Sequence, residues 1–317
     1  MDIPWLKSLI ESWQSSLSQG RPPHALMITG APGTGKRAAA AWLSRQYLGM
    51  QPSQALPQYP LDIPEHADLR WITTPDDKHT IGIEQIRALV GDLSLTSYIG
   101  GGKVAVVEPA DVMTTNAANS LLKTLEEPPG DTLLILVADR LGRLPATIYS
   151  RCQRLNVRLP AESEGLAWLQ RVQAGVTTWP RLLHDAGGAP LAALSGLERV
   201  DDTDAMASDF VAIAEGNAAP LQVAAKWAKY EQDFVFGWLS RQVQSCINRA
   251  SGGESAGVSA VVAESVLRRI DRRNLFCYLD IINRLRGQPR GSFNVQLTLE
   301  CLLIDWSEGL QTVFGTE

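Results

Sequence analysis

The segment from Gly30 to Arg37, GAPGTGKR, has the glycine and lysine spacing of a phosphate-binding loop (P-loop). In a working P-loop the backbone amides surround the phosphates, the lysine reaches the terminal phosphate oxygens, and a following Ser or Thr hydroxyl binds Mg²⁺. Arg37 stands in place of that hydroxyl, and a guanidinium has no lone pair to offer a metal. Residual ATP or ADP binding by Gly30, Gly33, Gly35 and Lys36 and a purely structural turn therefore both stay open.

A P-loop ATPase also needs acidic residues at the end of a second buried strand, one to position Mg²⁺ and one to activate the attacking water. The matching segment here, KVAVVEPAD, ends its apolar run at Glu108, which we interpret as a remnant of the metal-side acid. Pro109 follows and cannot polarise water, and Asp111 lies too far along. Loss of the base alone can lower a rate by about 10²- to 10⁴-fold. We therefore predict that the chain does not hydrolyse ATP on its own.

A third motif is Ser150-Arg151-Cys152, which follows the segment RLPATIY and lies downstream of NSLLKTLEEPP. Arginine carries a planar, permanent charge that can neutralise a phosphoryl group during transfer. Arg151 is therefore a candidate for a catalytic contribution. The alternative is a surface arginine in an ion pair, which contributes little to stability.

The elements that would position these residues alternate up to about residue 160. HALMITG, LRWITTP, KVAVVE and TLLILVA have the composition of buried strands, and AAAAWLSRQYL and IGIEQIRALVGDLS have apolar residues at helical spacing. Nearly continuous apolar strands separated by helices predict a parallel sheet covered on both faces. Residues 161–205 predict a small helical lid, and residues 206–317 predict helices alone.

The composition points to a globular chain. Of its 317 residues, 45% are hydrophobic, and no apolar run is long enough for a membrane helix. A formal charge of −5 gives no overall attraction to nucleic acid. We expect a cytoplasmic location and no membrane partner. The cysteines form no CxxC pair, which argues against a zinc site and a disulfide framework; they are Cys152, Cys246, Cys277 and Cys301.

These motifs together resemble the clamp-loader branch of the AAA+ ATPases. The segments GRPPHALMITGAPGTGK and IGIEQIRALVGDLSLTSYIGGGKVAVVEPAD, with LLKTLEEPP and SRC, are most similar to the delta-prime family of bacterial DNA polymerase III subunits. The resemblance is close from about residue 4 to 160 and looser beyond. It implies an α/β AAA+ P-loop domain with a parallel sheet over residues 1–160, a small helical lid domain over 161–205, and an all-α collar domain for oligomerisation over 206–317.

The resemblance also implies a function. Such a subunit does not hydrolyse ATP, requires no cofactor, and helps load the sliding β clamp onto primed DNA within the DNA polymerase III holoenzyme. Arg151 would be an arginine finger for ATP bound to a neighbouring subunit. The implied partners are the tau/gamma motor subunits and the delta subunit in a hetero-pentameric ring, the β clamp and, through the assembly, primer–template DNA.

Two positions depart from the family pattern. Many members carry a four-cysteine zinc module between the first helix and the second strand, but that interval here is proline-rich and lacks cysteine, and His66 alone cannot hold zinc. We therefore predict no metal. Ala138 and Asp139 supply no neutral hydroxyl or amide to sense a γ-phosphate after the fourth strand.

Two alternative functions remain. The first is an ATP-hydrolysing motor subunit of the same loader, which the intact Lys36 and the glycines favour. The second is a nucleotide-gated DNA-binding module, which the acidic net charge disfavours.

Overall fold

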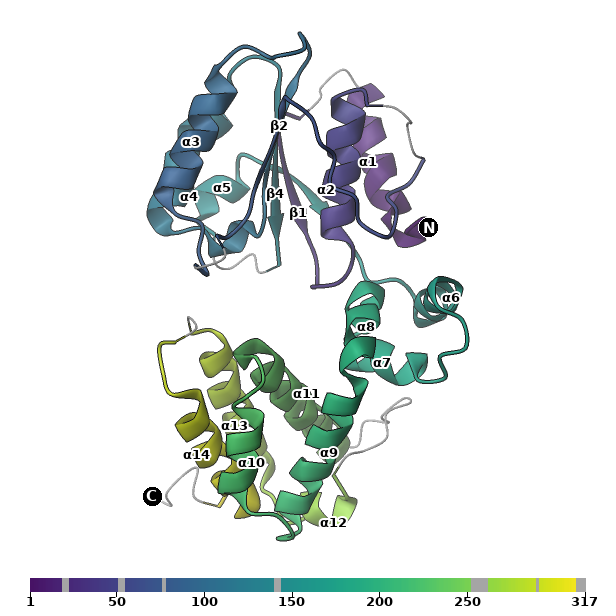
Figure 1. The fold of residues 1–317 in the computed structure, drawn as a ribbon, viewed down its shortest axis with the longest axis vertical. Coiled ribbons are helices and arrows are strands. Elements are labelled where there is room, and N and C mark those ends of the chain that lie inside the picture. Colours follow the sequence, from purple (N-terminus) through teal and green to yellow (C-terminus); the bar gives the residue numbers. More distant parts are fainter. Residues whose placement is uncertain are drawn as a thin grey trace. The chain divides into compact units, whose positions relative to one another are not determined.

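The computed structural model describes residues 1–18, 23–50, 55–75, 78–139, 144–251, 262–288 and 291–311. The chain divides into two compact units (Figure 1), Met1–Trp179 with Ala186–Leu194, and Pro180–Asp185 with Ser195–Glu317. The predicted lid, residues 161–205, has parts in both units. The division into three domains at 160 and 205 therefore stays a prediction.

The first unit is built on a parallel five-stranded sheet with the order β2-β3-β4-β1-β5. Every residue of β1, β3 and β4 is buried, as expected for strands covered on both faces. This confirms the predicted parallel sheet. The strands are β1 (Ala25–Thr29), β2 (Leu69–Ile72), β3 (Lys103–Val107), β4 (Thr132–Ala138) and β5 (Gln153–Asn156).

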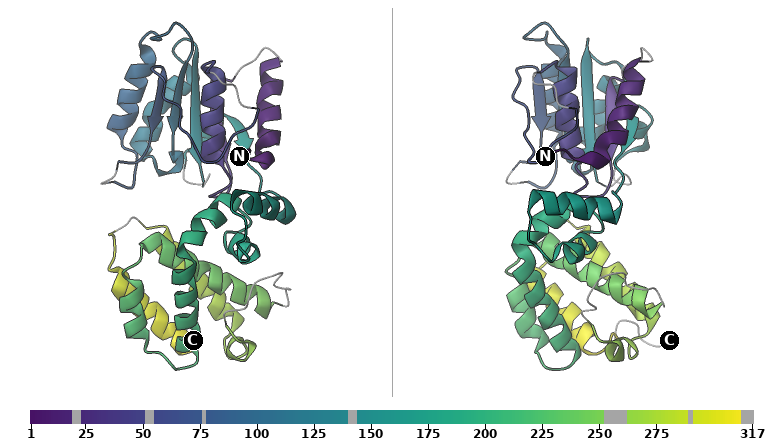
Figure 2. Two further views of the ribbon diagram at one scale, coloured as in Figure 1. Left: turned by 45° about the vertical axis from the view of Figure 1, so that its right-hand side comes forward. Right: turned by 90° about the vertical axis from the view of Figure 1, so that its right-hand side faces the viewer.

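Helices cover both faces of this sheet (Figures 1 and 2), with α1 and α2 on one side and α3, α4 and α5 on the other. In α3 the buried residues Ile86, Leu89 and Leu93 recur at helical spacing and form an apolar stripe. The Thr114 hydroxyl caps α4 by accepting from the Ala117 N–H. The bounds are α1 (Lys7–Ser18), α2 (Lys36–Tyr47), α3 (Ile83–Ser94), α4 (Thr115–Glu126) and α5 (Ala146–Tyr149), with 3₁₀ turns η1 (Pro4–Leu6) and η2 (Ala110–Val112).

Three helices follow the sheet: α6 (Glu162–Val172), α7 (Trp179–Asp185) and α8 (Pro190–Gly196). Trp168 of α6 donates its indole N–H to the Asp2 carbonyl at 2.8 Å. Its ring also makes edge-on contacts with Trp5 and Tyr59. These contacts attach α6 to the N-terminal segment of the first unit.

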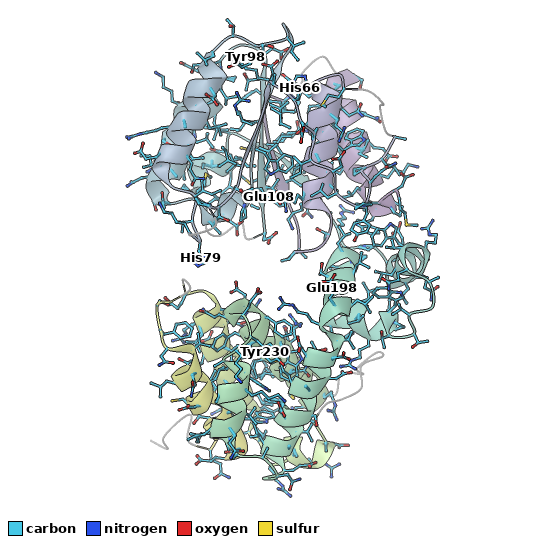
Figure 3. The ribbon with its side chains drawn as sticks, viewed as in Figure 1. His66, His79, Tyr98, Glu108, Glu198 and Tyr230 are labelled. Atoms are coloured by element: carbon cyan, nitrogen blue, oxygen red, sulfur yellow. The ribbon has the colours of Figure 1, made fainter. Side chains whose placement is uncertain are left out.

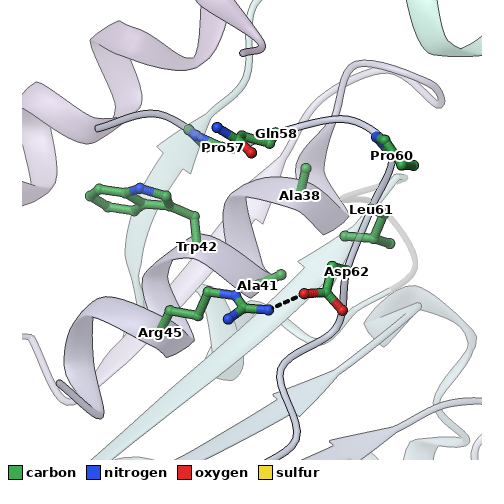
Figure 4. Close-up of a pocket in the computed structure, with 9 residues that line it drawn as sticks. All are labelled: Ala38, Ala41, Trp42, Arg45, Pro57, Gln58, Pro60, Leu61 and Asp62. Atoms are coloured by element: carbon green, nitrogen blue, oxygen red, sulfur yellow. Dashed lines mark hydrogen bonds and ion pairs between the residues drawn. The ribbon is translucent and has the colours of Figure 1, made fainter. Parts of the chain in front are cut away.

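The predicted proline-rich loop packs against α2 (Figure 4). The Ile3 N–H donates to the Pro57 carbonyl at 2.9 Å, and the Tyr59 N–H donates to the Met1 carbonyl at 2.8 Å. Arg45 of α2 forms an ion pair with Asp62 beside a small pocket. The backbone of the N-terminus therefore holds this loop. No group of three potential metal ligands occurs within the described residues, and the absence of zinc stays a prediction.

The second unit contains only helices in its described part, which confirms the predicted helical character of the C-terminal region. Its core is aromatic: Phe210 stacks on Trp306 with ring centroids 4.2 Å apart and contacts Trp238 edge-on. No described helix has the length and hydrophobicity needed to cross a membrane. The elements are η4 (Leu197–Arg199), α9 (Val200–Ala214), α10 (Pro220–Trp227), α11 (Gln232–Ala250), α12 (Glu264–Leu267), α13 (Arg272–Arg286) and α14 (Val295–Ser307).

The buried carboxylate of Asp68 organises the loop between α3 and β3. It accepts from the Tyr98 N–H at 2.7 Å, the Ser97 hydroxyl at 2.9 Å and the Ile99 N–H at 3.2 Å. Burial on its own would raise the pKa of Asp68, but these hydrogen bonds hold it below its ordinary value of 3.8. His66, the lone histidine of the proline-rich interval, accepts from the Asp68 N–H at 3.0 Å.

Replacing Asp68 by Asn should lower the free energy of unfolding by about 1–3 kcal/mol at neutral pH, since three donors lose a charged acceptor. A lowered folded-state pKa stabilises the fold above the ordinary value of 3.8, and this contribution is lost as the pH falls through the folded-state pKa. The difference between variant and wild type should therefore narrow in acid, as measured by urea unfolding at several pH values. Asp62→Asn, which removes an exposed ion pair, is the control. A difference independent of pH would contradict the role of the charge.

Candidate functional site

The P-loop joins β1 to α2 through a turn that requires glycine. Gly30 and Gly33 have φ angles of 148° and 75°. A Cβ atom on Gly30 would lie 2.5 Å from the Val157 carbonyl oxygen, and one on Gly33 would lie 2.4 Å from the Ala192 Cβ. No other residue fits these two positions without a shift of the backbone. Gly35, also at positive φ, directly precedes the first residue of α2, Lys36.

The Lys36 ammonium is paired with groups of its own chain. The side chain is only 6% exposed, and Nζ lies 2.6 Å from Asp139 Oδ1. Nζ also donates to the carbonyls of Gly30 at 2.9 Å and Ala31 at 2.7 Å. Because an ammonium has three donors, Lys36 is fully satisfied by the loop and this carboxylate.

Sheet register brings Asp139 to the P-loop. Strands β1 and β4 are parallel neighbours in which Thr29 pairs with Ala138, so the residues that follow each strand emerge side by side. The backbone N–H of Asp139 donates to the buried Asp111 carboxylate at 3.2 Å. The sequence indicates only that Asp139 lacks the neutral hydroxyl or amide that would sense a γ-phosphate. Its ion pair with Lys36 was not predicted, and only the pairing of β1 with β4 makes it visible.

The structure brings together Arg37, which replaces the metal-binding hydroxyl, and Glu108, the predicted remnant of the metal-side acid. Arg37 Nε lies 2.9 Å from Glu108 Oε2, which also accepts from the Trp71 indole N–H at 3.2 Å. Glu108 follows β3 at the carboxyl edge of the sheet (Figure 3) and its side chain is 16% exposed. Burial raises the pKa of the Glu108 carboxyl, and Arg37 and Trp71 limit the rise.

These contacts do not fit Mg²⁺-nucleotide. The positions of the metal-binding hydroxyl and the metal-side acid hold a cation and a carboxylate that pair directly with each other. The lysine that would reach the phosphates is paired with Asp139. The group contains two basic and three acidic side chains: Lys36, Arg37, Glu108, Asp111 and Asp139.

Arg151 lies in a separate group. It follows α5, and its Nη1 donates to the Thr147 carbonyl at 2.9 Å and the Ser150 hydroxyl at 3.3 Å. Nη2 forms an ion pair with Glu126 at the end of α4. Among the described residues, none of its polar partners belongs to the P-loop. Cys152 is buried, and burial raises the pKa of its thiol to about 12, so it is an unreactive core residue.

Comparison with known proteins assigns the chain to one family. A family model for DNA polymerase III, delta subunit matches residues 5–161. DNA polymerase III subunit delta' of Pseudomonas aeruginosa is 28% identical over 320 residues, which cover 96% of this chain and 97% of that protein. The chain belongs to the delta' family.

Two further delta' subunits match over shorter lengths, and other DNA polymerase III subunits are more distantly similar. The delta' subunit of Escherichia coli is 34% identical over 203 residues, 61% of each chain, and the delta' subunit of Bacillus subtilis is 38% identical over 146 residues, 44% of each. DNA polymerase III subunit tau of E. coli is 22% identical over 85% of this chain and 41% of its own length. A DNA polymerase III gamma subunit-related protein from Thermotoga maritima aligns over 97% of this chain and 99% of its own with 19% identity and a TM-score of 0.48.

Family membership confirms the resemblance and, with the parallel sheet and the helical second unit, the predicted fold class. The roles assigned to Arg151 and to the P-loop residues stay predictions.

Replacing Arg37 by Ala should raise the pKa of Glu108 further, because burial then acts without the cation. A raised folded-state pKa stabilises the fold at low pH, and this contribution is lost as the pH rises through that pKa. Between acid and neutral pH, the free energy of unfolding of the variant should therefore fall by about 1 kcal/mol more than that of wild type. The difference is small because the Arg37 side chain is half exposed. Carbon-detected NMR titration of Glu108 measures the pKa, and Arg37→Lys is the control. An unchanged pKa would contradict the pairing.

Proposed function

We propose that the chain is a subunit of the DNA polymerase III clamp loader that does not hydrolyse ATP and that supplies Arg151 to ATP bound by a neighbouring subunit. The observation that carries the proposal is the pairing of Lys36 with Asp139 and of Arg37 with Glu108 within one P-loop. Membership in the delta' family supports the assignment to DNA polymerase III.

Three features argue against hydrolysis by this chain. Mg²⁺ requires oxygen ligands in near-octahedral geometry, and Arg37 provides none. The Glu108 oxygen that could serve as a ligand already accepts from Arg37 and Trp71. Pro109 follows Glu108 at the position of the general base. Metal binding and water activation are both lost, which fits a subunit without its own turnover.

The P-loop also disfavours nucleotide itself. A polyphosphate would have to displace the Asp139 carboxylate from Lys36, and it would then face that carboxylate as a like charge at close range. No cofactor is therefore required for the role that we propose, and the P-loop serves as a rigid turn between β1 and α2.

Arg151 is suited to act on another chain. Its side chain is 33% exposed, and its partners are a carboxylate and two neutral oxygens on the surface of the first unit. Arginine fingers stabilise the charge that develops during phosphoryl transfer and are worth about 10³ to 10⁵ in rate. The similarity to tau subunits supports a ring of related subunits in which such a contact forms.

The remaining partners follow from the resemblance. We propose that the motor subunits tau/gamma and the delta subunit flank this chain in a hetero-pentameric ring in the cytoplasm. The assembly would load the β clamp onto primer–template DNA. Residues 206–317 would form the collar through which the subunits associate.

The first test is Arg151→Ala in the reconstituted loader. Turnover at the one ATP site that this chain completes should fall by about 10³- to 10⁵-fold. The clamp- and DNA-stimulated ATPase rate of the whole loader should therefore fall by at least the fraction that this site contributes. The matched control is Arg154→Ala, an exposed arginine on β5. Size-exclusion chromatography checks that each variant assembles. An unchanged rate would refute the finger, and ATP turnover by the isolated chain, abolished by Lys36→Ala, would indicate a motor subunit.

The second test concerns the pairing of Lys36 with Asp139 in the P-loop. Asp139→Asn removes the negative charge from Lys36 and should increase the affinity for ADP about tenfold or more, since a hydrogen bond to a charged group is worth about 1.5–3 kcal/mol. Titration with a fluorescent ADP analogue, with and without Mg²⁺, measures the change. The gain should disappear in the double variant Lys36→Ala/Asp139→Asn. If wild type and Asp139→Asn bind the ADP analogue equally tightly, the ion pair between Asp139 and Lys36 does not disfavour nucleotide.

A further inference from the structure

The candidate finger has a partner on its own chain. Arg151 Nη2 is paired with the carboxylate of Glu126, which lies at the end of α4 in the segment LLKTLEEPP. The side chains are 33% and 50% exposed, so the pair lies at the surface of the first unit. The function proposed for Arg151 does not by itself account for this contact.

The guanidinium is held on two sides. Nη1 donates to the Thr147 carbonyl at 2.9 Å and to the Ser150 hydroxyl at 3.3 Å, both neutral oxygens of its own turn. Nη2 faces the only charged partner, Glu126, among the described residues. Phosphate and carboxylate oxygens compete for the same guanidinium donors. An incoming phosphate can therefore take the place of Glu126 while the neutral contacts keep the arginine oriented.

The strength of the pair suits such an exchange. Solvent screens an ion pair between two partly exposed side chains, which is typically worth up to ~1 kcal/mol, or about a fivefold population bias. This bias is small beside the about 10³- to 10⁵-fold effect of a finger on the rate. The carboxylate can therefore hold the arginine at rest without preventing its engagement.

We propose that Glu126 is a positioning residue that retains Arg151 on its own chain until the phosphates of the neighbouring subunit's nucleotide displace the carboxylate. The proposal rests on the function proposed for Arg151. It makes Glu126 a restraint on basal turnover, because the resting ion pair competes with engagement of the finger.

The test is Glu126→Gln in the reconstituted loader. Basal ATPase, without clamp or DNA, should rise about two- to fivefold, because the variant removes a competing pair worth up to that bias. The apparent KM for ATP should fall, and turnover saturated with clamp and primed DNA should change little. The matched control is Glu127→Gln, which removes the adjacent exposed carboxylate; no ion pair of Glu127 occurs within the described residues.

A double variant separates this proposal from the one on which it rests. In an Arg151→Ala background, Glu126→Gln should have no further effect. A basal rate that is unchanged or lower in Glu126→Gln, or one that rises equally in the Arg151→Ala background, would overturn the restraint while leaving the finger in place. If Arg151→Ala alone leaves turnover unchanged, the finger assignment fails and the restraint fails with it. Glu126→Asp, which keeps the charge, should retain a basal rate close to that of wild type.

Discussion

The buried ammonium of Lys36 is the charge on which the arrangement of the P-loop depends. With a side chain that is 6% exposed, it needs an anion close by, because an unpaired buried charge costs several kcal/mol. In an ATPase the phosphates of the substrate meet this need. Here Asp139 and two loop carbonyls meet it from within the chain. The glycine turn, the lysine and the start of α2 can therefore persist as structure without a nucleotide.

The order of the strands makes this internal neutralisation possible. All five strands are parallel, so the segments that follow them emerge at one edge of the sheet, where α/β proteins place their ligands. Because β4 lies between β3 and β1, Asp139 follows the strand beside the P-loop. Glu108 follows β3 on the other side of β4 and pairs with Arg37 at the same edge. The edge of the sheet at which α/β proteins commonly bind ligands is thus occupied here by the side chains of Asp139 and Glu108, which follow adjacent strands.

Local sequence patterns predicted what depends on local burial. Strands β1, β3 and β4 are buried throughout and read as continuous apolar runs. Strand β5, Gln153–Asn156, was missed because only Leu155 is buried on this polar edge strand. Arg37 and Glu108 were each identified from their motifs, but their mutual pairing and the role of Asp139 depend on sheet register and rotamers. Local sequence patterns also did not indicate the division between the two units, because residues 180–185 group with the second unit and residues 186–194 with the first.

Arg37 and Arg151 differ in how deeply their carboxylate partners are buried. Arg37 is paired with a carboxylate that is 16% exposed, and losing the cation would leave that carboxylate desolvated, so the pair resists exchange. Arg151 is paired with a carboxylate that is 50% exposed, which water can solvate once the arginine leaves. Loss of the arginine would therefore leave a more poorly solvated carboxylate at the P-loop than at the end of α4. This contrast fits the role that we propose, in which the chain does not act on a nucleotide of its own and Arg151 acts on the nucleotide of a neighbouring subunit.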